Sequence, residues 1–446
     1  MYRSALRSLR RVHGSALSLR RLHSSPRALA LPHPRRCVST GPSIVAGLSF
    51  EDHYSIRSNL QALIRDYARS DVPPLSFAFL TQHRPPLSTE QVYQLNLELV
   101  NYMLCYTCRQ LTALQQLPYI AALNPKVERT HALYLKTLQA LLNNNFPYDL
   151  YDRKKMRALL AAFLDDHQDT LQTLSDGMTD IMEHFPRQRA FAFLNDHLRN
   201  RITMKLLATH YLALLDQSGS LTSADRIGII QRDVKLSAFV SRIFEFVNDL
   251  CLLKYDHQPI KLVYAAGQDV RFTCIPVIVE YVMTEILKNS MRATIETHSD
   301  DSSTTTTTTP REIEVSIFEA APHSVVMRVR DYGGGIPPHI ESKIFDYSYT
   351  STTDATVGDT SPETTHGPTC TARDIDDIHS SAAADQMLPG ETVHNIAGMG
   401  FGLPLCKTYL ELFGGRIDIQ SLRGLGTDVY ITLTGPTDRE LGNSPA

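Results

Sequence analysis

The sequence predicts an α+β protein in which a helical N-terminal domain precedes a mixed α/β domain. Three patterns predict this class. Apolar residues recur at three- and four-residue spacing from about residue 51 to residue 250, which indicates helices. Between residues 251 and 435, alternating apolar and polar residues indicate strands, and glycine-rich turns separate them. A chain of 446 residues is long enough for two such domains, each with its own core.

The first fifty residues differ in charge from the rest. They contain nine arginines and no Asp or Glu. The rest of the chain therefore carries 35 of the 44 basic residues and all 47 acidic residues. An arginine- and serine-rich start without acidic residues is typical of a mitochondrial transit peptide, and it predicts a protein of the mitochondrial matrix. The alternative is a basic tail for nucleic acid or a membrane surface. We expect no nucleic-acid partner and no transmembrane segment, since no apolar run reaches about 18 residues.

Helix-start signals organise residues 51–250. Ser88-Thr-Glu-Gln91 has the spacing of a capping box, and Asn124 followed by Pro125 predicts the start of another helix. Further long helices are expected over 153–185 and 186–216. Long helices with short connections predict an up-down four-helix bundle.

The second domain is expected to begin with a strand pair at 260–264 and 270–274, followed by a central helix that starts near Pro276. Two polar inserts interrupt it. Residues 299–309 include six consecutive threonines, and residues 351–395 are rich in Thr, Ser, Asp and Gly. Residues 436–446 form a short tail.

The central helix carries the first candidate site. Glu285 and Asn289 are four residues apart, so a helix places both on one face. A carboxylate beside an amide oxygen suits magnesium-dependent phosphoryl transfer, because one group can act on the attacking hydroxyl while the other holds the metal. Arg292 lies near the same face and can meet a phosphate oxygen.

Three glycine-rich turns follow. Asp331 ends an alternating run and precedes Gly333 and Gly335; a carboxylate there can accept a hydrogen bond from a purine amino group, and the glycines let the backbone approach the base. Residues 398–404, Gly-Met-Gly-Phe-Gly-Leu-Pro, open a helical run, and a helix N-terminus favours phosphate. The turn at 424–426 leads into a strand on which Thr427 can contact the nucleotide.

In this order the four elements resemble the N, G1, G2 and closing boxes of the ATPase superfamily of DNA gyrase, MutL and the histidine kinases (GHKL). The residues in these boxes resemble those of the mitochondrial α-keto acid dehydrogenase kinases, which are serine kinases of the pyruvate and branched-chain complexes. The resemblance covers about residues 52–434. It implies a GHKL-type α/β sandwich behind the helical bundle.

The resemblance also implies the roles of residues. Glu285 is expected to act on the target serine hydroxyl, Asn289 to hold Mg²⁺, and Asp331 to select adenine. His167 lies in a motif that the family keeps near its active cleft and is the second catalytic candidate. The residues expected to contact ATP are Glu285, Asn289, Arg292, Asp331, Gly333, Gly335, Thr350, Ser351, Gly398, Met399, Gly400, Phe401, Gly402, Leu403 and Thr427.

The family further implies the partners. They are the lipoyl-bearing acyltransferase core and the decarboxylase component of a dehydrogenase complex, together with a second copy of the chain. Tyr281, which stands where pyruvate dehydrogenase kinases usually have His, and the absence of tryptophan favour a branched-chain substrate, but the choice of complex stays open.

Two other functions are compatible with the pattern. A histidine kinase would carry its phosphate on His167 or His210, although Gln follows the first and Tyr the second, not the acid of a phosphoacceptor box. A non-catalytic ATP-driven scaffold would not need Glu285. The P-loop, HRD, DFG, HExxH and GxSxG motifs are absent from the sequence, so the kinase, hydrolase and metalloprotease classes that use them are not indicated.

Overall fold

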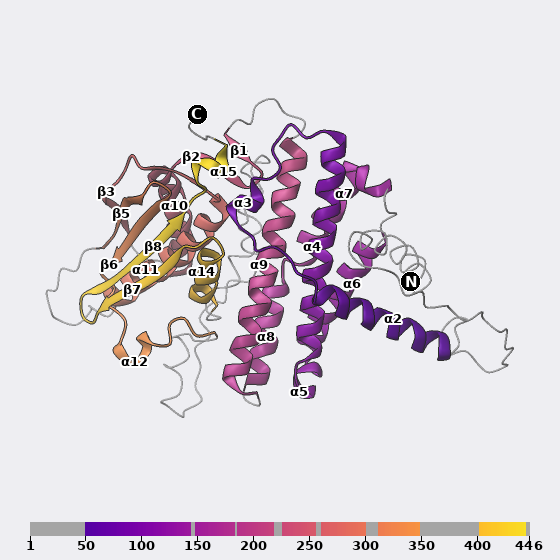
Figure 1. The fold of residues 1–446 in the computed structure, drawn as a ribbon. Helices are drawn as coiled ribbons and strands as arrows, with labels where there is room; N and C mark the ends of the chain where they lie inside the picture. Colours follow the sequence, from indigo (N-terminus) through magenta and orange to yellow (C-terminus); the bar gives the residue numbers. More distant parts are fainter. Residues whose placement is uncertain are drawn as a thin grey trace. The chain divides into compact units, whose positions relative to one another are not determined.

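The structure is a computed structural model that describes residues 50–143, 148–182, 185–217, 225–255, 260–299, 311–347 and 401–442. Figure 1 labels the helices and strands along the chain. The chain divides into two compact units. The first unit comprises the described residues up to Val72 together with Leu87–His167. The second comprises Pro73–Pro86 and the described residues from Gln168 onwards. The predicted domain boundary between residues 250 and 251 stays a prediction, and the predicted transit peptide lies outside the described residues.

The first unit is helical. It contains α2 (Phe50–Ala68), α4 (Thr89–Gln115), α5 (Tyr119–Ala122), α6 (Pro125–Leu142), the 3-10 helix η2 (Tyr148–Tyr151) and α7 (Arg153–Asp166). The two predicted helix starts are present. Ser88 and Gln91 form a reciprocal capping box at the start of α4, and the Asn124 side chain accepts the N–H groups of Lys126 and Val127 at the start of α6.

The helix predicted over 153–185 is two helices. α7 ends at Asp166 and α8 (Thr170–Met182) begins four residues later. His167 is the C-cap of α7, with φ −100° and ψ 8°. Its ring is buried, contacts the Thr137 hydroxyl at 2.7 Å, and packs beside Tyr134 and Phe163. These contacts are with residues distant in sequence, so helical periodicity alone did not indicate the break.

The second unit combines helices with two sheets. Its helices are α3 (Phe77–Leu80), α8, α9 (Arg187–Gln217), α10 (Leu236–Tyr255), α11 (Pro276–Ser299), α12 (Pro338–Glu341), α14 (Gly402–Glu411) and α15 (Asp438–Leu441). Its strands are β1 (Arg226–Ile227), β2 (Ile230–Lys235), β3 (Lys261–Ala266), β4 (Arg271–Cys274), β5 (Glu312–Ala321), β6 (Ser324–Asp331), β7 (Arg416–Leu422) and β8 (Gly426–Thr434). The predicted α+β class is confirmed: within the described residues, every strand lies after the long helices α4 and α9.

The strands form a three-stranded sheet, β1-β2-β4, and a five-stranded sheet, β3-β5-β6-β8-β7. β3 pairs with β5 in parallel, and the other pairs are antiparallel. The prediction that β3 and β4 pair with each other was wrong. β4 pairs with β2, and the sequence analysis did not predict β1 or β2. Partners far away along the chain decided both pairings.

Side chains of β6, in the five-stranded sheet, point alternately to the two faces of the sheet. Val325, Met327, Val329 and Asp331 of β6 are all buried, and α11 packs against β5 and β6. The register pairs Asp331 with Thr427 of β8, which is also buried. The even-numbered residues of β6 lie on the opposite face. The last residue of β6 is therefore a carboxylate on the helix-covered face.

Among the residues that the structure describes, no helix combines the length and the apolar character that crossing a membrane requires.

Candidate active site

The base of the candidate site is the middle of α11, where Glu285 is almost completely buried and Asn289, one turn later, is exposed. The apolar residues of α11 fill the core under the sheet, among them Val282, Met283 and Ile286. Their burial fixes the rotation of the helix, and the rotation places Glu285 at the edge of the core. The sequence prediction of one shared face for Glu285 and Asn289 agrees with this helix.

Glu285 lies between its own helix and the start of α14. Its Oε1 is 2.6 Å from the Lys288 ammonium, and both side chains are buried. On its other side, a Cβ built on Gly402 would lie 2.5 Å from Oε2. Gly402 is the first residue of α14, so only glycine leaves room for the carboxylate there. The structure thus brings Glu285 and Gly402, two predicted site residues, into contact.

The groups behind Glu285 are neutral. Burial, and then the negative charge of Glu285, raise the pKa of the Tyr281 phenol and of the Cys406 thiol well above their usual values. Tyr281 packs on Tyr409 of α14 with ring centroids 4.8 Å apart. Tyr281 and Cys406 therefore keep their protons near neutral pH and add no negative charge beside the carboxylate.

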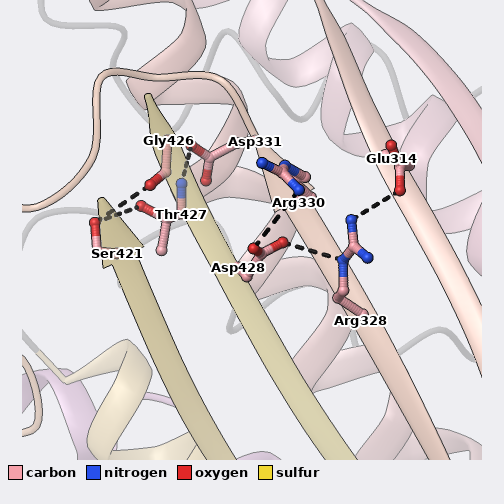
Figure 2. A network of polar contacts seen from close by, with 8 residues as sticks. All are labelled: Glu314, Arg328, Arg330, Asp331, Ser421, Gly426, Thr427 and Asp428. Carbon is pink, nitrogen blue, oxygen red and sulfur yellow. Dashed lines mark hydrogen bonds and ion pairs between the residues drawn. The ribbon is translucent and has the colours of Figure 1, made fainter. Parts of the chain in front are cut away.

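The second part of the candidate site is Asp331, at the end of β6. Its Oδ1 accepts the backbone N–H of Gly333 at 3.0 Å and that of Thr427 at 3.3 Å, and the Ser290 hydroxyl of α11 is also bonded to the carboxylate. Figure 2 shows Asp331 beside Thr427 at the end of β6. Burial raises the pKa of Asp331 above its usual value, and these three hydrogen bonds oppose the rise.

The glycine turn after Asp331 is fixed from two sides. A Cβ on Gly333 would lie 2.5 Å from the Ala293 Cβ, so this backbone rests directly on α11. Gly335 has φ +75°, where glycine is favoured, and the Ile336 N–H donates to the Ser421 hydroxyl at 2.6 Å. Gly424 donates to the Gly334 carbonyl at 2.8 Å. The turn therefore connects α11 with the β7–β8 hairpin.

The opposite face of the sheet carries an ionic network that points away from α11. Arg328 contacts Glu314 at 2.9 Å and Asp428 at 3.1 Å, and Arg330 lies 3.9 Å from Asp428 (Figure 2). Alternation separates these even-numbered side chains from Asp331 and Thr427. They stabilise the strand ends without entering the candidate site.

The third part of the candidate site is the start of α14. The helix begins at Gly402, and the preceding residue, Phe401, supplies no side-chain cap. The N-terminus of a helix favours an anion, because its first N–H groups point along the axis toward a ligand. Phe401 itself is buried and packs on Tyr347, whose hydroxyl donates to Asn195 of α9 at 2.6 Å. This packing anchors the helix start.

Other predicted residues have different surroundings. Arg292 is in an ion pair with Glu296 at 2.6 Å. Leu403 follows Gly402 on α14. His167 belongs to the first unit and has the contacts given above. Thr350, Ser351, Gly398, Met399 and Gly400 lie outside the described residues.

The sequence analysis missed Lys288, Ser290, Tyr347 and Ser421. The first two lie on α11 between Glu285 and Arg292, and their spacing from Glu285 and Asn289 was the available signal. Tyr347 and Ser421 contact residues more than eighty positions away along the chain, and nothing local marks them.

His210, the other phosphoacceptor candidate, lies on α9 and is buried. Its Nδ1 accepts the Ile229 N–H at 3.3 Å, and the ring is also hydrogen-bonded to the Leu80 carbonyl. Burial lowers its pKa to about 3. A Cβ on Gly228 would overlap the ring, so the surrounding backbone is in close contact with it. Both ring nitrogens have structural partners, which argues against a phosphoacceptor at this position.

The residues present fit a magnesium nucleotide. Among the described residues, no cluster of three His, Cys, Asp or Glu side chains could hold a metal ion by itself. Mg²⁺ is commonly bound through one or two protein oxygens together with substrate phosphates. The exposed amide of Asn289, one turn after Glu285 on α11, offers such a ligand.

Replacing Asp331 with Asn is expected to separate stability from nucleotide binding. Since the pKa of Asp331 is raised in the folded state, folding of the wild type loses stability as pH rises from 3.8 through the folded-state pKa, and the variant lacks this loss. We expect a free energy of unfolding near pH 7 that is equal or higher. ATP affinity should fall by about 10- to 100-fold, the value of a charged hydrogen bond.

Urea unfolding and calorimetric ATP titration of both proteins measure these effects. Unchanged ATP affinity in the folded variant would contradict the adenine-binding role of Asp331.

Comparison with known proteins agrees with this geometry. Residues 74–231 match the family model of the mitochondrial branched-chain alpha-ketoacid dehydrogenase kinase. Residues 275–367, which include Glu285 and Asp331, match that of the histidine kinase-, DNA gyrase B- and HSP90-like ATPase, so the chain contains an ATPase domain of this class.

Full-length relatives extend the match. The chain is 41% identical over 403 residues to [pyruvate dehydrogenase (acetyl-transferring)] kinase 1, mitochondrial, of Saccharomyces cerevisiae, which covers 89% of this chain and 93% of the relative. It is 24% identical over 333 residues to isozyme 1 of Rattus norvegicus (72% and 68%) and 24% identical over 333 residues to isozyme 4 of the same organism (72% and 71%). The chain belongs to the family of mitochondrial pyruvate dehydrogenase kinases.

Proposed function

We propose that this protein is a magnesium-dependent serine kinase of the mitochondrial matrix that phosphorylates and inactivates the decarboxylase component of the pyruvate dehydrogenase complex. The observation that carries the proposal is the buried Glu285 carboxylate, whose Oε2 lies against Gly402, the first residue of α14. A pure ATP-binding module needs Asp331 and the helix start, but it has no use for a base beside them. The S. cerevisiae relative, to which the chain is 41% identical, is named as a pyruvate dehydrogenase kinase, and this supports pyruvate dehydrogenase as the substrate.

Each residue has one task in the proposed reaction. Asp331 accepts a hydrogen bond from the adenine amino group, and the N–H groups of Gly402 and Leu403 bind phosphate oxygens. Glu285 accepts the proton of the serine hydroxyl as that oxygen attacks the γ-phosphorus. Asn289 would hold Mg²⁺, which would supply positive charge to the phosphates. Such catalysis consists mainly of positioning and charge stabilisation.

Two protonated groups near Glu285 serve this task. The phenol of Tyr281 and the thiol of Cys406 remain protonated because burial raises the pKa of each. Neither competes with the serine as a nucleophile. Their low polarity strengthens the pull of the carboxylate on the serine proton.

Two arguments from the sequence favoured a branched-chain substrate. They were Tyr281 and the absence of tryptophan. The helical-region family model also carries the branched-chain name. The relatives above, which match along most of the chain, are pyruvate dehydrogenase kinases. We therefore propose pyruvate dehydrogenase, with the branched-chain complex as the second arm of the test.

Transfer of ³²P from Mg·ATP tests the function. The full chain is offered each purified complex separately, with Glu285→Gln as the inactive control. We expect acid-stable phosphoserine on the pyruvate complex and none with the variant. Label on the branched-chain complex alone would correct the substrate. Acid-labile label would indicate a histidine kinase, and ATP binding without label on either complex would favour the scaffold.

We further propose that the protein docks on the lipoyl-bearing core of the complex and acts as a homodimer. The support is family membership. Co-sedimentation with the purified core and light scattering of the free protein measure the two properties. A monomer that still labels the complex would remove the dimer from the proposal.

Asn289→Ala is expected to weaken Mg·ATP binding by about tenfold or more, because the metal loses a protein ligand. Titration with and without Mg²⁺ separates this effect from a general disturbance. The affinity for metal-free ATP should be the same in both proteins. An equal benefit from Mg²⁺ in wild type and variant would exclude Asn289 as the metal ligand.

A further inference from the structure

The ion pair between Lys288 and Glu285 is unusual because it is buried. Nζ and Oε1 are 2.6 Å apart, and only 11% of the Lys288 side chain and 5% of the Glu285 side chain are exposed. Removing two charges from water is expensive, and such a pair seldom stabilises a fold more than apolar residues would. An exposed position for Lys288 would avoid this cost. The burial of the pair therefore calls for a reason other than stability.

The two oxygens of Glu285 have different surroundings. Oε1 faces the Lys288 ammonium, and Oε2 faces Gly402, where an added Cβ would lie only 2.5 Å away. Gly402 opens α14, whose first N–H groups lack a side-chain cap. Oε2 is thus the oxygen that lies against the start of α14, and Oε1 contacts Lys288, one turn later on α11.

The contact is an attraction of charges. Neither Oε1 nor Nζ has a hydrogen-bond partner at an acceptable angle among the described residues, although they are 2.6 Å apart. Both charges also act on Cys406 of α14: Glu285 raises the pKa of this thiol and Lys288 lowers it, while burial has the largest effect. The pair therefore lies directly against α14, in a medium where a charge interaction orients strongly.

We propose that Lys288 is a positioning residue that holds Oε1 of Glu285 and thereby directs Oε2 to the serine hydroxyl. This inference rests on the proposed function of Glu285 as the base. In the transfer step, Oε2 takes the hydroxyl proton and the serine oxygen forms a bond to the γ-phosphorus. The bond from that phosphorus to the bridging oxygen breaks, and its electron pair leaves with ADP. Lys288 touches neither substrate; it fixes which oxygen faces them.

Lys288→Met in the full chain tests the inference, with the pyruvate dehydrogenase complex as substrate. A carboxylate displaced by about 1 Å can cost on the order of 100-fold in rate, so we expect kcat to fall by about 10- to 100-fold. The Kd for Mg·ATP should stay the same. Lys288→Arg, which keeps the charge, should recover most of the rate. Lys407→Met is the matched control, because Lys407 pairs with Glu411 at 3.9 Å on the surface of α14.

A double-mutant cycle separates positioning from a general structural effect. In the Glu285→Gln background, Lys288→Met should cause no further loss of single-turnover rate, because there is no carboxylate left to direct. The same fold-loss in both backgrounds would overturn the inference. So would unchanged kcat, or weaker Mg·ATP binding at unchanged kcat, which would make Lys288 a phosphate ligand.

Two outcomes keep the inference distinct from the proposed function. Full turnover by Glu285→Gln would contradict both the role of Glu285 as the base and the role of Lys288 as its positioning residue. An inactive Glu285→Gln with a fully active Lys288→Met would remove only the latter. Should Lys288→Met fail to fold, Lys288→Gln provides the comparison, because its amide can donate a hydrogen bond to Oε1 without carrying a charge. The kcat of Lys288→Gln should be lower than that of the wild type and of Lys288→Arg. It should be higher than that of Glu285→Gln.

Discussion

Replacing Glu285 with Gln is expected to lower the turnover of the kinase by about 100-fold or more while ATP binding stays near normal. The amide has the shape of the carboxylate and can still accept a hydrogen bond, but it cannot take the serine proton at neutral pH. Nucleotide affinity should persist because Asp331 and the start of α14 are unaffected. Phosphoryl transfer to the pyruvate dehydrogenase complex and calorimetric ATP titration measure the two quantities.

The change also leaves Lys288 as a buried cation without a carboxylate, and the loss of one partner of a buried pair can cost several kcal/mol. Thermal unfolding must therefore accompany the kinetics. Glu411→Gln is the control, since its side chain is about half exposed and its ion pair with Lys407 is long. Loss of ATP binding in a folded Glu285→Gln protein would contradict the assignment, as would full turnover.

Gly402→Ala should abolish phosphoryl transfer as completely as the loss of the base, although it adds only one methyl group. The new Cβ would lie 2.5 Å from Oε2 of Glu285 and 3.3 Å from its Cδ. The carboxylate cannot retreat freely, because Lys288 holds Oε1 and the buried Tyr281 and Cys406 lie behind it. A misplacement of about 1 Å is enough for a loss on the order of 100-fold.

The contact involves the end of a side chain, so the fold should survive, and the melting temperature is expected to change little. Gly414→Asn is the matched control at the other end of α14. Gly414 has φ +79° and open space around it, and Asn tolerates this conformation. Normal turnover by Gly402→Ala would show that Oε2 does not work at the position described.

The sequence by itself determined the local features of the protein. The capping box at Ser88 and the Asn124-Pro125 pair gave two helix starts, because a cap is formed by residues three or four positions apart. The register of α11 followed from its apolar residues, and with it the placement of Glu285 and Asn289. The order of glycine turns then led to the ATPase domain, since close approach of backbone to a ligand requires glycine.

The tertiary structure decided whatever depends on residues far apart in the chain. β4 pairs with β2 and not with β3, and His167 ends α7 through contacts with Tyr134 and Thr137. Asp331 accepts the N–H of a residue 96 positions away, and Oε2 of Glu285 meets a glycine more than a hundred positions away. Spacing in the sequence shows which side chains share a helix face, but burial and the packing of α14 on α11 decide which oxygen of Glu285 lies against Gly402.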